Sequence, residues 1–136
     1  MQEKHLFEYA VIRVVPRVER EEFINAGVIL YCRDRRFLGA RISVNEQRLH
    51  ALCPLLDIRE LIEHLQAFEK IALGNKDGGP IACLDPAGRF RWLTATRSTI
   101  VQASKVHPGL CSDPEEMLER LHKQLVELPE GEGKVR

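Results

Sequence analysis

The stretch that decides the fold is residues 9–32, YAVIRVVPRVEREEFINAGVILYC. Two segments that overlap it, residues 7–15 and 23–32, are apolar at both odd and even positions, which is typical of strands covered on both faces. Pro16 ends the first segment, and a run of charged residues follows it. The stretch therefore predicts two buried strands joined by a charged loop.

Three residues of these strands, Arg13, Asn25 and Gly27, differ from the apolar residues that a core strand usually contains. If the strands pair antiparallel through the loop, positions whose numbers sum to about 38 oppose each other. A bulge at Gly27 would shift this pairing by one residue. The sequence therefore predicts that Arg13 and Asn25 are cross-strand neighbours.

Length and charge restrict the class of protein. A sequence of 136 residues fits one domain that buries about two-thirds of its unfolded surface. Its 20 Lys and Arg residues balance 20 Asp and Glu residues, so the bulk electrostatic attraction behind generic nucleic-acid binding is missing. The N-terminal sequence lacks a signal-peptide pattern, and no apolar run approaches the ~20 residues of a membrane span. We therefore expect a cytoplasmic protein that binds neither bulk nucleic acid nor membrane.

The four cysteines, Cys32, Cys53, Cys83 and Cys111, stand far apart and form no C-x-x-C pair. Without an export signal they should be reduced, and Cys32 and Cys53 follow apolar segments, so these two are predicted to be buried free thiols. His50 and Cys53 would supply only half of a metal site. The sequence therefore predicts no metal and no cofactor.

A hairpin is predicted around residue 34. Residues 33–36, Arg-Asp-Arg-Arg, form a charged turn, and residues 37–42 resume as a strand. Three arginines around one Asp could meet a phosphate, but charged hairpin tips are also common because they serve solubility and blunt strand edges. We favour the second interpretation.

Helices follow this hairpin. Asn45 is expected to cap a helix at residues 46–52, and Asp57 a longer helix that has one apolar stripe and ends at Gly74. The glycine-rich loop at 74–80 invites a phosphate-binding interpretation. We reject it, because the loop follows a helix and does not lead into one.

The second half of the sequence adds two strands and a last helix. Residues 90–95 and 99–104 are predicted strands, and residues 105–109 a polar turn. Asp113 and Pro114 predict the start of the last helix, because Asp caps a helix and Pro fits its first turn.

Together these elements predict an α+β domain, a mainly antiparallel sheet of about five strands with two larger helices packed on one side of it. Hairpins dominate the early part, and helices come in blocks rather than alternating with every strand. We expect residues 1–128 to form a single globular domain. Residues 129–136 have little apolar content and are expected to be a disordered tail.

Landmarks along the whole sequence match those of one family. They are Tyr9–Arg13 with Pro16, Glu22–Val28, Gly79–Ile81, Phe90–Ala95, Arg97–Ser104, Val106–Leu110 and Asp113-Pro114. In these residues the protein resembles a bacterial family catalogued as domain of unknown function 3037. The resemblance implies a single-domain, cytoplasmic, bacterial protein and brings no activity with it. It also implies a partner, a kinase-like protein of the toxin or persistence type.

No motif points to catalysis, since the sequence shows no nucleophile with a base, no paired carboxylates and no metal cluster. The unusual polar residues are instead donors suited to holding an anion or a peptide. We therefore favour a binding or regulatory module, which would act with the kinase-like partner. The alternative is a small enzyme that acts on a phosphate- or carboxylate-bearing substrate through the region of Arg13, Arg97 and His107.

The candidate site residues are Arg13, Asn25, Arg97, Ser98 and His107. An arginine on a two-sided apolar strand must be paired, because an uncompensated buried charge costs several kcal/mol. Glu22 or Glu8 could supply the pair internally. If neither does, we predict that the five candidate residues converge on one polar pocket that binds an anionic group, either a phosphate or a partner's carboxylate.

Overall fold

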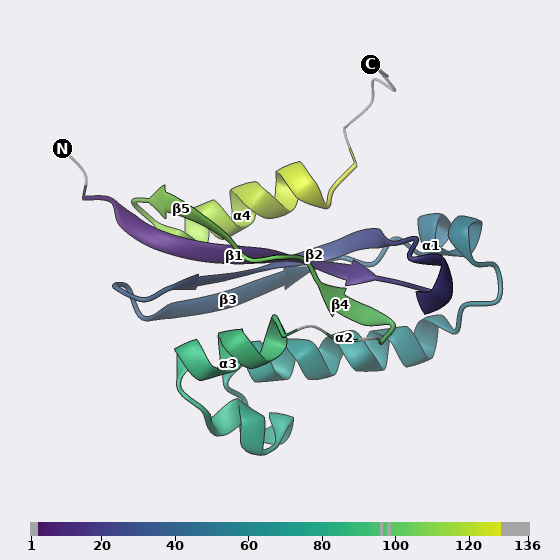
Figure 1. Cartoon of the computed structure of the whole chain (residues 1–136), viewed down its shortest axis with the longest axis horizontal. Helices are drawn as coiled ribbons and strands as arrows, with labels where there is room; N and C mark the ends of the chain where they lie inside the picture. The colour runs from purple at the N-terminus through teal and green to yellow at the C-terminus, as the bar shows by residue number, and fades with distance from the viewer. Residues whose placement is uncertain (1–2, 96, 98, 129–136) are drawn as a thin grey trace.

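The computed structural model describes residues 3–95, 97 and 99–128 (Figure 1). The predicted tail at 129–136 and the candidate residue Ser98 lie outside these described residues. The sheet has five strands: β1 (His5–Val14), β2 (Ile24–Cys32), β3 (Phe37–Ile42), β4 (Val101–Ala103) and β5 (His107–Cys111). All of its strand pairs are antiparallel, so the predicted α+β fold with an antiparallel sheet is confirmed.

β1 is the central strand. The sheet order is β3-β2-β1-β4, and β5 pairs with β1 on the same side as β4. β5 pairs with the first half of β1, from His5 to Tyr9, and β4 with its end, from Ile12 to Val14. Because neighbours lie on both of its edges, β1 satisfies backbone groups on both sides, as its continuous apolar sequence requires.

The hairpin of β1 and β2 has the predicted register at its closed end. Arg13 pairs with Asn25, and the pairing shifts by one residue on the other side of Ile12, which pairs with Gly27. The bulge therefore lies at Ala26, one residue from the position expected for it. A short 3-10 helix, η1 (Val18–Arg20), joins the two strands. The prediction that Arg13 and Asn25 are cross-strand neighbours is confirmed.

Gly27 is required by the close approach of β3. A Cβ atom at this position would lie 2.5 Å from the carbonyl oxygen of Arg41 and 3.1 Å from the side chain of Ile42. The first distance is a clash with backbone, so only glycine lets β2 and β3 pair here without a shift. This explains the glycine in an otherwise apolar strand.

Three helices match the predicted ones at the residues that start them. In α1 (Glu46–Leu52) the Asn45 side chain accepts from the backbone N–H of Arg48 at 3.0 Å, and in α2 (Ile58–Leu73) Asp57 accepts from Glu60 at 3.1 Å. α2 ends at Gly74, whose φ of 71° suits glycine. In α4 (Pro114–Leu125) Asp113 accepts from the backbone of Glu115 at 3.0 Å.

The segment predicted as a strand at 90–95 is instead helical. The helix α3 runs from Pro86 to Leu93, after two short 3-10 helices, η2 (Lys76–Gly78) and η3 (Pro80–Cys83). Asp85 caps it by accepting from Gly88 N–H at 2.9 Å, and Pro86 occupies its first turn. This start signal and the burial of Phe90 and Leu93 at helical spacing outweigh the local alternation of apolar residues.

The polar turn predicted at 105–109 is also wrong, because His107–Cys111 forms β5. Its Pro108 has no N–H to donate, which a strand at the edge of a sheet tolerates. β4 lies within the predicted strand at 99–104 but covers only Val101–Ala103. The sheet thus has the predicted number of strands, with residues 107–111 in place of 90–95.

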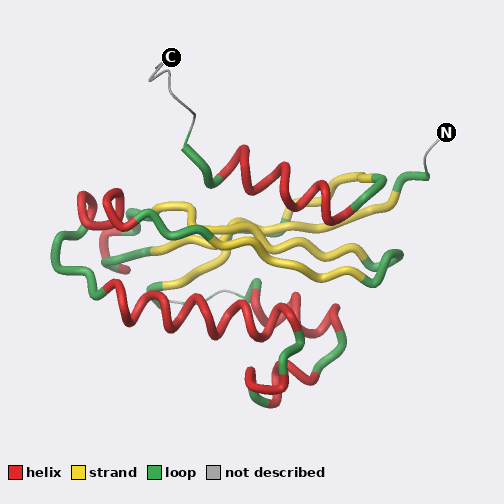
Figure 2. The backbone as a smooth tube through the Cα atoms, turned by 180° about the vertical axis from the view of Figure 1, so that it is seen from behind, coloured by secondary structure: helices red, strands yellow, loops and turns green. Residues whose placement is uncertain are grey.

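The larger helices lie on opposite faces of the sheet, which corrects the prediction that they share one side. Figures 1 and 2 show α2 and α3 below the sheet and α4 above it. One core cluster joins α2 and α3 to Ala10, Ile12 and Ile29. A second joins α4 to Phe7, Val28 and Leu30. The reason is that β1 and β2 are apolar on both faces, so each face needs a cover.

Polar contacts supplement the small core under α4. Arg41 of β3 forms an ion pair with Glu119 at 3.2 Å, and Ser43 Oγ lies 2.8 Å from Nε2 of His122.

Cys32 and Cys53 are buried free thiols, as predicted. None of the described helices is both long enough and apolar enough to cross a membrane.

Candidate functional site

Arg13 lies on the α4 face of the sheet, near the closed end of the β1–β2 hairpin. Its guanidinium carbon sits 4.1 Å from the centroid of the Phe23 ring, within the range of a cation–π contact. Arg13 is half-buried, whereas 42% of the surface of Phe23 remains exposed. The ring therefore acts as a platform that fixes the plane of the guanidinium at the surface.

Neither carboxylate suggested by the sequence pairs with Arg13. Glu22 instead binds Arg20, with 2.5 Å between Oε1 and Nε, and Glu8 opposes Tyr31 farther along the hairpin. Among the described residues no carboxylate lies within ion-pair distance of Arg13. The internal pairing that would have removed the need for an external anion is thus missing from the described part of the protein.

The nitrogens of Arg13 have no hydrogen-bond partner among the described residues. Nε is buried without an acceptor. Nη1 and Nη2 are not among the buried, unpaired atoms, and they too donate to none of the described residues. The end of the guanidinium fork is therefore left for an acceptor outside the described residues.

Two amide side chains flank Arg13 across the strands. Asn25 on β2 donates from Nδ2 to the carbonyl oxygen of Leu125 at 3.0 Å, near the C-terminal end of α4, and its own Oδ1 is buried without a described partner. Gln102 pairs with Arg13 on the β4 side and donates to the Thr99 carbonyl at 2.9 Å. The cross-strand neighbours of Arg13 are therefore both neutral and polar.

The other candidate residues do not join this pair. His107 on β5 packs against Tyr9, with ring centroids 5.3 Å apart. Arg97 stacks on the Trp92 ring at 4.0 Å and donates to the carbonyl of the same residue. No hydrogen bond, ion pair or stacking contact among the described residues links either of them to Arg13 or Asn25. The structure thus brings together Arg13 and Asn25, places Arg97 against α3, and leaves Ser98 outside the described residues.

A hollow of about 500 Å3 lies beside Asn25, bordered by the end of β3, the start of α1 and the end of α4. Ser43 borders it and contacts His122, which raises the question of a nucleophile with its base. Burial lowers the pKa of His122, assisted by the charge of Arg41, whereas Glu127 and the Arg41 carbonyl act in the opposite direction. The imidazole is therefore neutral at pH 7.

The His122 ring has one described side-chain hydrogen-bond partner, Ser43. Nδ1 is buried with no partner within hydrogen-bond geometry, and Nε2 lies 2.8 Å from Ser43 Oγ, a contact in which either atom donates, depending on the tautomer of the ring. No described carboxylate forms a hydrogen bond or ion pair with the ring that would orient it as a base. The contact attaches α4 to the segment that follows β3.

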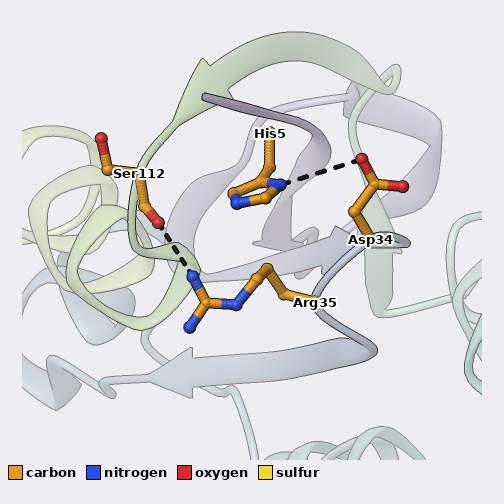
Figure 3. A network of polar contacts seen from close by, with 4 residues as sticks. All are labelled: His5, Asp34, Arg35 and Ser112. Carbon is orange, nitrogen blue, oxygen red and sulfur yellow. Dashed lines mark hydrogen bonds and ion pairs between the residues drawn. The ribbon is translucent and has the colours of Figure 1, made fainter. Parts of the chain in front are cut away.

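A larger hollow, of about 690 Å3, lies at the opposite end of β1. Figure 3 shows how the tip of the β2–β3 hairpin is held there: His5 Nδ1 lies 3.8 Å from Asp34 Oδ2, and Arg35 Nη1 donates to the Ser112 carbonyl at 3.1 Å. Arg35 is thus used to attach the hairpin tip to the segment before α4.

The charges that line this larger hollow are balanced. Three cations, Lys4, Arg35 and Arg120, face three acids, Glu3, Asp113 and Glu116. One of the acids, Asp113, already accepts hydrogen bonds from the first turn of α4. A mixed lining of this kind does not favour a simple anion, and the Arg13 site remains the better candidate.

Two members of the Arg13 site, Phe23 and Gln102, are not among the five candidate residues, although Gln102 is one of the polar donors of the sequence. Phe23 stands two residues before Asn25, so the strand period of two places it on the same face. This spacing is enough to place Phe23 beside Asn25 from the sequence alone. Gln102 could not be placed, because its pairing with Arg13 depends on which segment forms the strand beside β1. Among the described residues, no group of three or more His, Cys, Asp or Glu side chains could hold a metal ion.

The landmarks that form the Arg13 site lie within a segment that a family model recognises. No curated protein and no solved structure matches the sequence. A family model described as "Protein of unknown function (DUF3037)" matches residues 9–126. This range includes Arg13 on β1, Asn25 on β2 and all of α4. The match spans far more than half of the sequence, and the protein therefore belongs to the DUF3037 family.

Proposed function

We propose that the protein is a binding or regulatory module that holds an anionic group of a partner at Arg13. The observation that carries this proposal is the guanidinium itself, which is half-buried, stacked on Phe23 and without a carboxylate partner among the described residues. A charge placed in this way gains more from an incoming anion than a fully solvated arginine, because it is already partly desolvated.

The site also has the composition of a protein-interaction hot spot. Arginine and aromatic residues dominate such spots because they combine large contact areas with directed donors. The stacked pair of Arg13 and Phe23 offers both, and its side chains are fixed before the partner arrives. The kinase-like protein of the toxin or persistence type that the family resemblance implies is the partner to test first.

Anion binding is tested by thermal unfolding with phosphate, sulfate and nucleotides at constant ionic strength. The wild type should be stabilised, Arg13→Gln should lose the stabilisation, and Arg17→Gln should keep it, because Arg17 is an exposed arginine of the neighbouring loop. Arg97→Ala should also keep it, since Arg97 packs on Trp92. The absence of any anion-dependent shift in the wild type would remove small free anions as ligands.

Partner binding is tested by pull-down with the purified kinase-like protein. We expect capture by the wild type and by Arg17→Gln, and at least about a tenfold loss of affinity in Arg13→Gln, as for a charge-assisted contact at the centre of an interface. Equal capture by Arg13→Gln and wild type would show that this surface is not the contact.

A further inference from the structure

We infer that the anion taken by Arg13 is a carboxylate presented by a protein segment, either an Asp or Glu side chain or the C-terminal carboxylate of a polypeptide, rather than a phosphate. This inference rests on the proposed function and narrows it to one chemical class. Three features of the described residues carry it: the number of cations at the site, the direction in which the guanidinium is open, and the charge of its surroundings.

None of the described residues that pair with or contact Arg13 is a second cation. Asn25 and Gln102, which flank Arg13 on the two neighbouring strands, are neutral amides, and Arg20, in the loop of the same hairpin, is already paired with Glu22. A carboxylate carries one negative charge, whereas a phosphate group carries roughly 1.5 to 2 at pH 7. One guanidinium therefore matches a carboxylate and leaves a phosphate with charge that nothing at the site neutralises.

The open direction of the guanidinium fits a planar ligand. Nε is buried, which closes the side of the fork that includes it, and the Phe23 ring covers one face. Nη1 and Nη2 remain, and together they offer two parallel N–H donors at the spacing of the two oxygens of a carboxylate. A ligand bound in this way lies in the plane of the guanidinium, beside the exposed part of the Phe23 ring.

The surroundings disfavour a second negative charge. Asn25 donates to the carbonyl of Leu125, so the C-terminal end of α4 adjoins the site. This end of a helix carries a partial charge of about −0.5, and the two exposed side chains beside it, Lys123 in the last turn and Glu127 after it, have opposite charges that offset each other. A dianion is repelled by this partial charge more strongly than a monoanion, which adds to the preference for a carboxylate.

The test is an amide NMR titration with propionate and with sulfate, at pH 7 and matched ionic strength. Propionate is a monoanion with a planar carboxylate, and sulfate is a dianion with the tetrahedral shape of phosphate. We expect propionate to shift the signals of Phe23, Asn25 and Gln102 in a saturable way, and sulfate to bind at least about threefold more weakly, since site and helix end both act against it.

Two variants separate charge from geometry. Arg13→Lys keeps the charge but loses the fork, so propionate affinity should fall about tenfold, the value of one lost charge-assisted hydrogen bond. Arg17→Lys, the same change on the neighbouring loop, should leave it unchanged.

The outcomes distinguish the inference from the proposed function. If sulfate binds at these residues as tightly as propionate or more tightly, or if Arg13→Lys binds propionate normally, the carboxylate assignment is overturned and anion binding at Arg13 survives. If neither ion gives saturable shifts at these residues, both the assignment and the small-anion form of the proposed function fail. Saturable binding of propionate with the expected losses supports both.

Discussion

Arg13 is half-buried and stacked on Phe23, and no described carboxylate pairs with it, which determines what its removal should do. In Arg13→Gln the fold loses a stacking contact on Phe23 but no ion pair with a described residue. We expect the free energy of unfolding in urea to fall by at most about 1 kcal/mol, the upper value of an exposed cation–π contact. A loss above about 2 kcal/mol would instead mean that an internal partner holds the guanidinium.

His122 should make stability depend on pH. Its pKa is lowered, chiefly by burial, so the unfolded protein takes up a proton at a higher pH than the folded one. The stability that depends on the neutral ring is present above the unfolded pKa of about 6.5 and is lost as pH falls from there toward the folded pKa.

We therefore expect the urea midpoint of the wild type to drop between about pH 7 and pH 5, with a shallower drop in His122→Gln. The other histidines are present in both proteins, so the difference between the two curves reports on His122. His107→Gln is the matched control, because it removes a histidine whose ring lies on the surface. Parallel curves for wild type and His122→Gln would exclude this origin of the pH dependence.

At the scale of elements, α3 shows where local signals compete. Residues 90–95 alternate like a strand, but Asp85 and Pro86 start a helix, and Phe90 and Leu93 reach the core only at helical spacing. Asp85→Ala should therefore cost about 1 kcal/mol, as expected for the loss of an N-cap, measured by urea unfolding. Asp77→Ala, in the exposed turn η2, is the control and should cost clearly less. Equal effects would mean that the cap contributes little to α3.

The elements that the sequence predicts correctly are those with local start and stop signals. Asn45, Asp57, Gly74 and Asp113 mark their helix ends by backbone chemistry that needs no tertiary partner. β5 was missed because Pro108 and Gly109 read as a turn in isolation, and only pairing with β1 makes them a strand. The site follows the same rule: the hairpin register places Arg13 beside Asn25, whereas Arg97 turns back onto Trp92 because the segment predicted as a strand there is the helix α3.

At the scale of the whole molecule, the sheet is enclosed between helices, and this determines how reactive its thiols are. Cys32 and Cys111 lie in the core under α4, and burial raises the pKa of Cys111, with the neighbouring thiol of Cys32 adding to the effect. We expect iodoacetamide at pH 7.5 to label exposed Cys83 within minutes and the buried Cys32, Cys53 and Cys111 far more slowly, as read by peptide mass spectrometry. Fast labelling of Cys111 would show that the contact between α4 and the sheet opens readily.

The central position of β1 also has a consequence for the order of events on the ribosome. β1 can form its hairpin with β2 as soon as both are made, but its other edge is completed by β4 and β5, about 90 residues later in the sequence. At the usual speed of synthesis this leaves that edge open for roughly 5 to 20 s. During this interval the nascent polypeptide presents an unpaired apolar strand edge, and it is then that the protein is most exposed to mispairing with a neighbouring molecule.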